Sequence, residues 1–437
     1  MLNSLRIQNF KSWQDTGDIQ FGSITGFFGT NSSGKTSILQ FLLMLKQTVE
    51  SSDRAQILNL GDERSYVELG TMHDILHNHD ESENIRFALG WQEEAGSEDY
   101  KKYHFSQNTP YVFSANIKTR SNNIYLEEFF YKIHDLTYRI YRENTNYRMI
   151  VTNRNYKSFS EQMIGKIDKF YYAPFLSNDY FVEVEPQLAT AYTSFNWFFG
   201  SIFYLGPLRA NPKRLYVWGG SNTDDVGKEG EKTIAAILAS KNQNKGTSDN
   251  ILDLEQHVAY WLKELGLIHS FEVRPIAPNR KEYEVRIKRT AESAEVFLTD
   301  VGFGVSQLLP VLVLLFYVPE GSTIILEQPE IHLHPAVQAG LADVFIDAIK
   351  RRNVQIILES HSEHLLQRLQ RRLAEEALPT DQVKLYFTDF VGAASTLTPL
   401  DLDEYGNIRN WPKNFFGDTM GEAAAMMEAE MKRKMQS

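Results

Sequence analysis

The segment Gly29–Thr36, which reads GTNSSGKT, constrains this chain more than any other part of its sequence. It fits the pattern G-x-x-x-x-G-K-[ST], with an apolar run before it and helical apolar spacing in residues 37–45 after it. In a strand, loop and helix of this kind, backbone N–H groups and the helix N-terminus surround phosphate groups. Lys35 would add a positive charge beside the phosphates, and the Thr36 hydroxyl would ligate Mg²⁺. The pattern predicts a nucleoside triphosphate site with the candidate residues Asn31, Ser32, Ser33, Gly34, Lys35, Thr36 and Ser37.

Length and composition narrow the class of protein. The 437 residues exceed one ordinary domain, so a head with an insertion is expected. Because the chain has no cysteine, disulfides, thiolate metal sites and cysteine nucleophiles are excluded. Residues 1–10 lack the apolar core of a signal peptide, and the longest apolar run, Leu308–Val318, is too short to cross a bilayer and predicts a buried helix. We therefore expect a cytoplasmic protein with no membrane partner.

The N-terminal strand supplies the first family resemblance. Residues 5–13 alternate apolar and polar side chains, and the turn Asn9–Ser12 precedes the glycine-rich loop by about twenty residues. This arrangement resembles the ATP-binding heads of ABC-type ATPases of the chromosome-maintenance and overcoming-lysogenization-defect groups. The resemblance implies ATP and Mg²⁺ as ligands, and it places Lys11 and Ser12 near the nucleotide. An ordinary edge strand with a solvated lysine is the alternative. In such heads residues 61–74 would carry a Mg²⁺-contacting glutamine, but none is present, so that role is left unassigned.

A second motif opens the long apolar helix. The segment Thr299–Gln307 is a glycine-flanked turn that contains Gly-Phe-Gly-Val-Ser-Gln. It resembles the ABC signature motif, which lies at a helix N-terminus. The resemblance implies that Gly304 and Ser306 bind the γ-phosphate of ATP held by a second subunit. It therefore implies a homodimer formed through ATP.

A third motif, Thr323–Glu327, is an apolar strand that ends in a carboxylate. An acid at the carboxyl end of a buried parallel strand is expected beside Thr36, where Glu327 would hold Mg²⁺ directly or through water. Two features depart from the ABC-type pattern. The usual aspartate is Glu327, and the following residue, normally a glutamate that polarises the attacking water, is Gln328. Glu330 is the remaining nearby acid, so either Gln328 or Glu330 would serve the water.

A fourth motif follows the strand Val354–Glu359. The segment Ser360–His364 resembles the position at which a histidine of ABC-type heads reaches the γ-phosphate, and His361 is the match. Two further histidines, His332 and His334, lie in a loop that matches the dimer interface of such heads. A zinc site formed by these histidines is disfavoured, because their spacing fixes no carboxylate or cysteine partner.

The middle of the chain, residues 81–200, has short alternating runs rich in tyrosine and phenylalanine and predicts a mostly β insertion. Within it, residues 131–157 carry six Lys or Arg against two Asp or Glu, with five tyrosines, a composition that can grip and stack nucleic acid. The favoured interpretation is an ordinary antiparallel sheet with solvated charges, including a hairpin of residues 136–142 and 147–151. Residues 203–209 and 225–233 occur in similar ATPases without a role that their chemistry reveals, and residues 240–250 predict a polar loop.

The whole sequence predicts an α/β fold, an ABC-type P-loop head with a mostly β insertion and a short C-terminal module. The predicted parts are residues 1–80 and 201–380 for the head, 81–200 for the insertion and 381–437 for the module. The module resembles an uncharacterised one on predicted bacterial AAA-type ATPases, and it is too short for the Toprim nuclease domain of related proteins.

The expected function is a slow ATPase that regulates a separate effector, such as a nuclease, in antiviral defence or DNA maintenance. Nucleic acid remains a possible partner, because the net charge of −11 argues only against binding by the whole surface. A scaffold locked by ATP, with little hydrolysis, is the alternative. A transporter subunit is disfavoured, because nothing resembles a membrane-coupling element.

Overall fold

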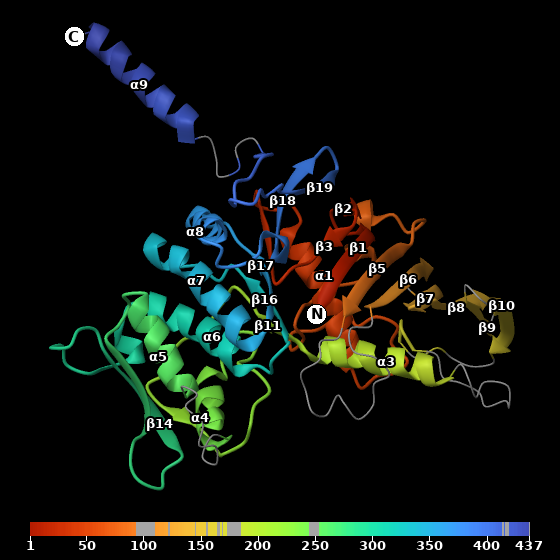
Figure 1. Cartoon of the computed structure of the whole chain (residues 1–437), viewed down its shortest axis with the longest axis horizontal. Coiled ribbons are helices and arrows are strands. Elements are labelled where there is room, and N and C mark those ends of the chain that lie inside the picture. The colour runs from red at the N-terminus through yellow and green to blue at the C-terminus, as the bar shows by residue number, and fades with distance from the viewer. Residues whose placement is uncertain are drawn as a thin grey trace.

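The computed structural model describes residues 1–92, 110–120, 123–144, 146–153, 156–163, 167, 169–172, 185–243, 253–412, 415 and 419–436. Within these residues the chain forms three β-sheets with helices packed around and between them (Figure 1). The predicted α/β fold with a mostly β middle segment is confirmed.

A six-stranded sheet carries the sequence motifs. Its order is β11-β16-β17-β4-β18-β19, and all neighbours pair in parallel except β18 and β19. The strands are β11 (Ile202–Leu205), β16 (Thr323–Glu327), β17 (Gln355–Glu359), β4 (Ile24–Gly29), β18 (Val383–Val391) and β19 (Ala394–Pro399). The central strands are continuous apolar runs because both of their faces are covered.

Alternate side chains of these strands enter two different cores. Ile324 and Leu326 of β16 pack in one core with α6 (Phe303–Tyr317), α7 (Pro335–Arg352) and α8 (Glu363–Ala374). Ile325 enters the other core, which includes α1 (Lys35–Glu50) and the largest sheet. The apolar run 308–318, predicted as a buried helix, lies in α6 except for Val318, and all of it is buried apart from the partly buried Tyr317.

The nine-stranded sheet joins the N-terminal strands to the middle of the chain. Its path is β10-β9-β8-β7-β6-β5-β1-β2, and β3 pairs with the other side of β1. The strands are β1 (Leu2–Phe10), β2 (Trp13–Asp15), β3 (Ile19–Gln20), β5 (Ile85–Gln92), β6 (Pro110–Arg120), β7 (Asn123–Ile133), β8 (Leu136–Glu143), β9 (Asn146–Asn153) and β10 (Tyr156–Met163). Helix α3 (Glu185–Gly200) packs against it (Figure 1). The middle segment therefore continues a sheet that β1 begins, and the exact domain limits stay a prediction.

The predicted hairpin is confirmed, because β8 and β9 pair antiparallel from Leu136↔Asn153 to Glu143↔Asn146. One residue of its turn, Thr145, lies outside the described residues. Tyr131 of β7 and Tyr138 of β8 are fully buried rather than exposed.

A third sheet and two helices form a lobe beside α6 (Figure 1). The sheet contains β12 (Tyr216–Val217), β14 (Glu282–Lys288), β13 (Ser270–Pro275) and β15 (Val296–Phe297), and the helices are α4 (Thr233–Gln243) and α5 (Leu254–Glu264). The loop predicted for residues 240–250 is wrong at its start, because residues 240–243 continue α4. The rest of that segment lies outside the described residues.

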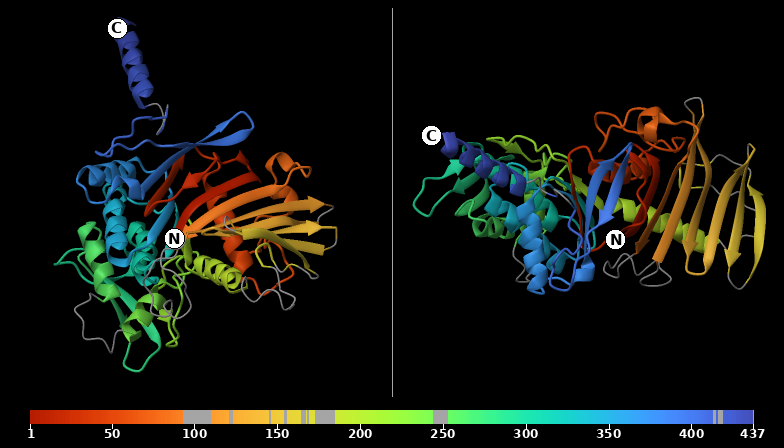
Figure 2. Two further views of the ribbon diagram at one scale, coloured as in Figure 1. Left: turned by 45° about the vertical axis from the view of Figure 1, so that its right-hand side comes forward. Right: turned by 90° about the horizontal axis from the view of Figure 1, so that it is seen from above.

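The C-terminal part divides between the sheet and a separate helix. Strands β18 and β19 extend the six-stranded sheet, whereas α9 (Thr419–Gln436) stands clear of it in Figure 1 and in the left view of Figure 2. The remaining elements are short: α2 (Met72–Ile75), η1 (His77–His79), η4 (Leu298–Asp300) and η5 (Thr380–Gln382). Among the described residues, no helix combines the length and apolar character needed to cross a membrane.

Candidate functional site

The glycine-rich loop joins β4 to α1 at the carboxyl edge of the six-stranded sheet. Three of its residues have a positive φ, the region that favours glycine: Gly29 with φ +141°, Gly34 with φ +94° and the non-glycine Ser32 with φ +61°. The loop borders a cavity of about 540 Å³. The cavity is lined by Lys11, Ser12, Asn31, Ser32, Ser33, Gly34, Lys35, Thr36, Ser37, Gln328, Glu359 and His361. The structure thus brings loop residues 31–36 together with Gln328, His361 and the last two residues of the Asn9–Ser12 turn.

Lys35 is buried at the start of α1, with only 3% of its surface exposed. Its Nζ donates to the backbone carbonyl oxygens of Gly29, at 3.1 Å, and Thr30, at 2.7 Å. Burial lowers the pKa of Lys35, and the negative charge of Glu359 opposes that shift. A buried ammonium group with neutral carbonyl partners is costly and would gain from an anion in the cavity.

The Thr36 hydroxyl contacts an acid that sequence reasoning did not assign. Its Oγ1 donates to Oε2 of Glu359 at 2.7 Å. Glu359 ends β17, and it lies opposite Glu327, which ends β16, in the register of the two parallel strands. Glu327 is therefore one strand further from the glycine-rich loop, and its Oε1 accepts a hydrogen bond from the Tyr204 hydroxyl at 3.0 Å. The signal for Glu359 was the same as that for Glu327, an apolar strand that ends in a carboxylate.

The pKa values of both carboxyl groups lie above the ordinary value for glutamate. Burial, together with the nearby Glu359, raises the pKa of Glu327 to about 7. Burial also raises the pKa of Glu359, although the bond from Thr36 opposes this change. A hydroxyl and two buried carboxylates suit a hard divalent cation such as Mg²⁺, which would favour both ionised forms.

Such a metal site would also need ligands from water and from the phosphates of the nucleotide. Among the described residues, no group of three or more His, Cys, Asp and Glu side chains could hold a metal ion. Mg²⁺ commonly keeps several waters and binds through one or two carboxylates plus substrate phosphates. The set of Thr36, Glu327 and Glu359 fits this pattern.

Gln328 and Glu330, the two candidates for orienting water, have different surroundings. Gln328 lines the cavity, and its positive φ of 44° is unusual for a residue other than glycine. Glu330 is buried and does not line the cavity, and its Oε1 accepts a hydrogen bond from the backbone N–H of His361 at 2.7 Å. Burial raises the pKa of Glu330. The arrangement favours Gln328 as the group that can meet a water in the cavity.

His361 lines the same cavity, with 36% of its side chain exposed. Its Nε2 is 4.0 Å from Oε1 of Glu359. Burial and the positive charge of Lys35 lower the pKa of His361, so the ring is mainly neutral at pH 7. A neutral imidazole retains one N–H group, which can donate a hydrogen bond to a phosphate oxygen.

Arg209 is a second residue that sequence reasoning left without a role. It follows β11, and its three guanidinium nitrogens are buried without a hydrogen-bond partner in the part of the chain that the structure describes. Burial lowers its pKa to about 10, against the effect of Tyr204, Glu327 and Glu330, so it remains charged at pH 7. This cation partly balances the acids at the edge of the sheet.

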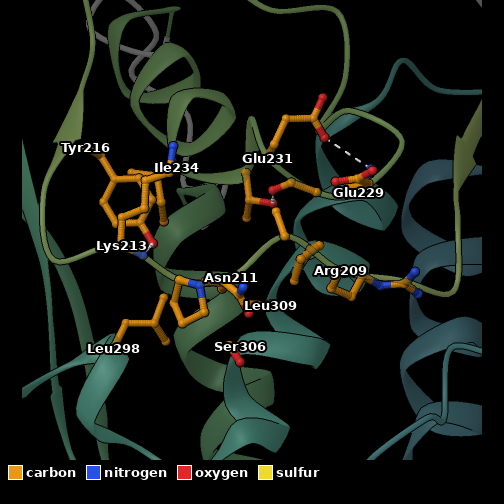
Figure 3. A pocket seen from close by; sticks show the side chains of 15 residues that line it. Arg209, Asn211, Lys213, Tyr216, Glu229, Glu231, Ile234, Leu298, Ser306 and Leu309 are labelled. Atoms are coloured by element: carbon orange, nitrogen blue, oxygen red, sulfur yellow. Dashed lines mark hydrogen bonds between the residues drawn. The ribbon is translucent and has the colours of Figure 1, made fainter. Parts of the chain in front are cut away.

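Gly304 and Ser306 lie in the first turn of α6, away from the cavity of the glycine-rich loop. The Ser306 hydroxyl donates to the carbonyl of Phe303 at 2.8 Å and faces another cavity, of about 360 Å³ (Figure 3). In Figure 3 the side chain of Arg209 lies on the opposite side of that cavity from Tyr216.

At the start of α6, Phe303 is exposed and its ring contacts His332. Within one chain, the signature-like segment and the glycine-rich loop are therefore separate.

A phosphate-binding loop after a parallel strand, with two acids at the ends of neighbouring strands, defines a P-loop nucleotide-binding protein. The family model described as AAA ATPase domain matches residues 1–192 and 214–366, and the chain belongs to this family. A second model, described as Protein of unknown function (DUF3696), matches residues 378–426. No curated protein matches the chain.

Solved structures with similar folds are heads of Smc proteins. One is an Smc head bound to the C-winged helix domain of ScpA, with 11% identity, a TM-score of 0.48 and coverage of 92% of this chain and 98% of that one. The SMC head domain from Thermotoga maritima has 12% identity, a TM-score of 0.42 and coverage of 92% and 99%. The Smc head with an extended coiled coil, bound to the C-terminal domain of ScpA derived from Pyrococcus furiosus, has 10% identity, a TM-score of 0.42 and coverage of 98% and 99%. All three are distant.

Proposed function

We propose that this chain binds ATP with Mg²⁺ in the cavity of the glycine-rich loop and hydrolyses it slowly. The observation that carries the proposal is the buried ammonium group of Lys35 at the N-terminus of α1, which faces a cavity bordered by Thr36 and Glu359. Membership of the AAA ATPase domain family supports the same activity. The helix N-terminus and Lys35 would both favour the triphosphate over a neutral ligand.

Each group around the cavity has a task that its chemistry allows. The loop N–H groups and Lys35 would hold the β- and γ-phosphates, and His361 would donate to the γ-phosphate. Thr36 and Glu359 would hold Mg²⁺, and Glu327, which ends the next strand and does not line the cavity, would reach it through water. When bound, Mg²⁺ supplies positive charge that offsets the negative charge of the phosphates.

Slow turnover follows from the group beside the attacking water. The Gln328 amide can orient a water but cannot accept its proton, whereas Glu330 is buried against the backbone of His361. Positioning alone supports phosphoryl transfer, because its transition state is loose, but such sites are slow until a partner completes them. We expect basal turnover below about 1 per second, the low end of ordinary enzyme rates.

We further propose that ATP joins two copies of this chain head to tail. Gly304 and Ser306 do not line the chain's own nucleotide cavity, so a second copy would present them to it. The dimer would act as a sensor or regulator of a separate effector, such as a nuclease, in antiviral defence or DNA maintenance in the cytoplasm. A scaffold locked by ATP with little hydrolysis is the second candidate, and Gln328 is the observation that favours it.

The first experiment measures ATP binding by calorimetry and phosphate release by the same preparations. Lys35→Ala should weaken ATP binding by about ten- to a hundredfold, because a hydrogen bond to a charged group is worth about 1.5–3 kcal/mol. Lys132→Ala, which changes an exposed lysine on β7, is the matched control and should bind as the wild type does. Unchanged affinity in Lys35→Ala would contradict the proposed site. Binding without phosphate release would favour the scaffold.

A further inference from the structure

The C-terminal hairpin completes the sheet beside the strand that leads into the glycine-rich loop. Residues 383–388 of β18 pair in parallel with the whole of β4, with Thr388 opposite Gly29 in the register. In Figure 1 the hairpin of β18 and β19 lies next to β2, although the two segments are far apart in the sequence, and β19 contacts β2. The hairpin belongs to the segment that matches the family of unknown function.

Thr388 forms a buried hydroxyl link to the glycine-rich loop. Its Oγ1 lies 2.6 Å from Oγ of Ser33, and both side chains are fully buried. The Thr388 hydroxyl is also 3.1 Å from the carbonyl of Phe28, and the Ser33 hydroxyl is 2.7 Å from the carbonyl of Thr30. The two hydroxyls have two protons for these three contacts, so when Ser33 donates to Thr30, the Thr388 hydroxyl can donate either to Ser33 or to the carbonyl of Phe28.

The carbonyl of Thr30 connects this link to Lys35. The Thr30 carbonyl accepts hydrogen bonds from both Ser33 Oγ and Lys35 Nζ, each at 2.7 Å. A change at Thr388 that releases Ser33 would therefore alter the surroundings of Lys35. Thr388 itself does not line the nucleotide cavity.

Ser395 forms a second link on β19. Its backbone N–H donates to the carbonyl of Ser12 at 2.8 Å, and its hydroxyl donates to the Ser12 hydroxyl at 2.7 Å. Ser12 lines the nucleotide cavity, and the neighbouring Trp13 donates from Nε1 to the carbonyl of Gly34 at 3.0 Å. Ser395 is buried and does not line the cavity itself.

The loop glycines leave space for this hairpin. A Cβ atom on Gly29 would lie 2.0 Å from the carbonyl oxygen of Thr388, and one on Gly34 would lie 2.6 Å from Oγ of Ser395. Both distances are far below a van der Waals contact. The two glycines thus permit close approach of Thr388 and Ser395 as well as the backbone turn.

We propose that Thr388 and Ser395 are positioning residues for the glycine-rich loop, through which the C-terminal hairpin sets the affinity for nucleotide. Neither residue lines the nucleotide cavity, but Thr388 contacts the loop at Ser33, and Ser395 contacts Ser12 in the neighbouring turn. This inference rests on the proposed binding of ATP. It gives a role to the hairpin of a module whose family has no known function.

The test separates the hydroxyl of Thr388 from its shape in the full-length chain. Thr388→Val keeps the branched shape and removes the hydroxyl, whereas Thr388→Ser keeps the hydroxyl and loses a methyl group. We expect Thr388→Val to bind ATP about tenfold more weakly, the effect of one lost hydrogen bond, and Thr388→Ser to bind nearly as the wild type does. Ser395→Ala should also weaken binding, and Thr398→Val, at an exposed position on β19, is the control.

A second measurement is independent of nucleotide. Hydrogen exchange of the amides of residues 30–36 in the ligand-free protein should be faster in Thr388→Val and unchanged in Thr388→Ser and Thr398→Val. Equal ATP affinity and equal exchange in Thr388→Val and wild type would overturn the inference, as would a loss that follows shape and appears in Thr388→Ser. If the wild type bound no ATP, the proposed function would fail, and the exchange experiment would still decide the role of the hairpin.

Discussion

Two buried carboxylates of like charge, Glu327 and Glu359, make the ligand-free site electrostatically unfavourable. Their strands place them side by side, and the nearby cations are the buried Lys35 and Arg209. The protein therefore gives up some stability at this edge, and a site that binds a cation regains it when the cation is bound.

The stability of the metal-free protein should depend on pH through Glu327. Its pKa of about 7 in the folded chain lies above its ordinary value of 4.5, so protonation favours the folded state. Stability from this group is complete below about pH 4.5 and is lost as the pH rises through 7, by about 3 kcal/mol in all. Glu327→Gln cannot ionise, and the Tyr204 hydroxyl can still donate to its amide oxygen.

We therefore expect Glu327→Gln to be more stable than the wild type at pH 8 and close to it at pH 5. Urea unfolding with a chelator present, at both pH values, measures the difference. Glu83→Gln, at an exposed position, should show no such change and is the control. A Glu327→Gln variant that gains no stability at pH 8 would refute the stated ionisation of Glu327.

Gln328 provides the sharpest prediction about turnover. Gln328→Glu should raise the rate of phosphate release, because a carboxylate at this position can accept a proton as well as orient water. Glu330→Gln should leave the basal rate almost unchanged, because its amide oxygen can still accept from the His361 N–H. Fast wild-type turnover that survives Gln328→Ala and disappears in Glu330→Gln would instead identify Glu330 as the base.

At the scale of elements, several side chains of β7, β8 and β9 that could bind nucleic acid are instead engaged within the chain. Tyr131 and Tyr138 are buried, with hydroxyls bonded to the Tyr171 carbonyl and to the Gln187 side chain, respectively. Arg139 pairs with Glu128, and Arg148 pairs with Glu143. These two tyrosines are therefore not free to stack on bases, and these two arginines already pair with acids.

We expect the triple variant Arg139→Gln, Arg142→Gln and Arg148→Gln to leave any affinity for single-stranded DNA unchanged. Fluorescence anisotropy at low and moderate salt tests this. Binding by phosphate neutralisation would weaken steeply with salt, and the triple variant would flatten that dependence. Such a result would show that these side chains contact nucleic acid despite their ion pairs.

At the scale of the whole molecule, the sequence predicted the local parts better than their long-range partners. The strand before Gly29, the strand that ends at Glu327 and the helix after Thr36 have strong local patterns, and all three are present. The contact of Thr36 with Glu359, and that of Ser33 with Thr388, depend on which strands become neighbours. Strand order depends on tertiary pairing, and no pattern within a single segment carries it.

The final prediction concerns assembly. If two copies share each nucleotide, a chain with a defective loop and a chain with a defective signature segment should complement each other. For the chain with a defective signature segment, Gly304→Arg is a better choice than a change at buried Ser306, because a Cβ atom added at Gly304 meets only ordinary contacts, with Leu333 and His332. Lys35→Ala gives the chain with a defective loop. Each variant alone should be inactive, because both of its composite sites lack one part.

Mixing the two variants should restore about a quarter of wild-type activity, since half of the dimers are mixed and each has one intact site. Light scattering should show a dimer with ATP and a monomer without it. Mixing Gly304→Arg with the double variant Lys35→Ala and Gly304→Arg is the control, because no pair of these chains can form an intact site. No recovery on mixing, together with a monomer at every ATP concentration, would mean that the chain binds nucleotide alone and that the start of α6 serves another contact.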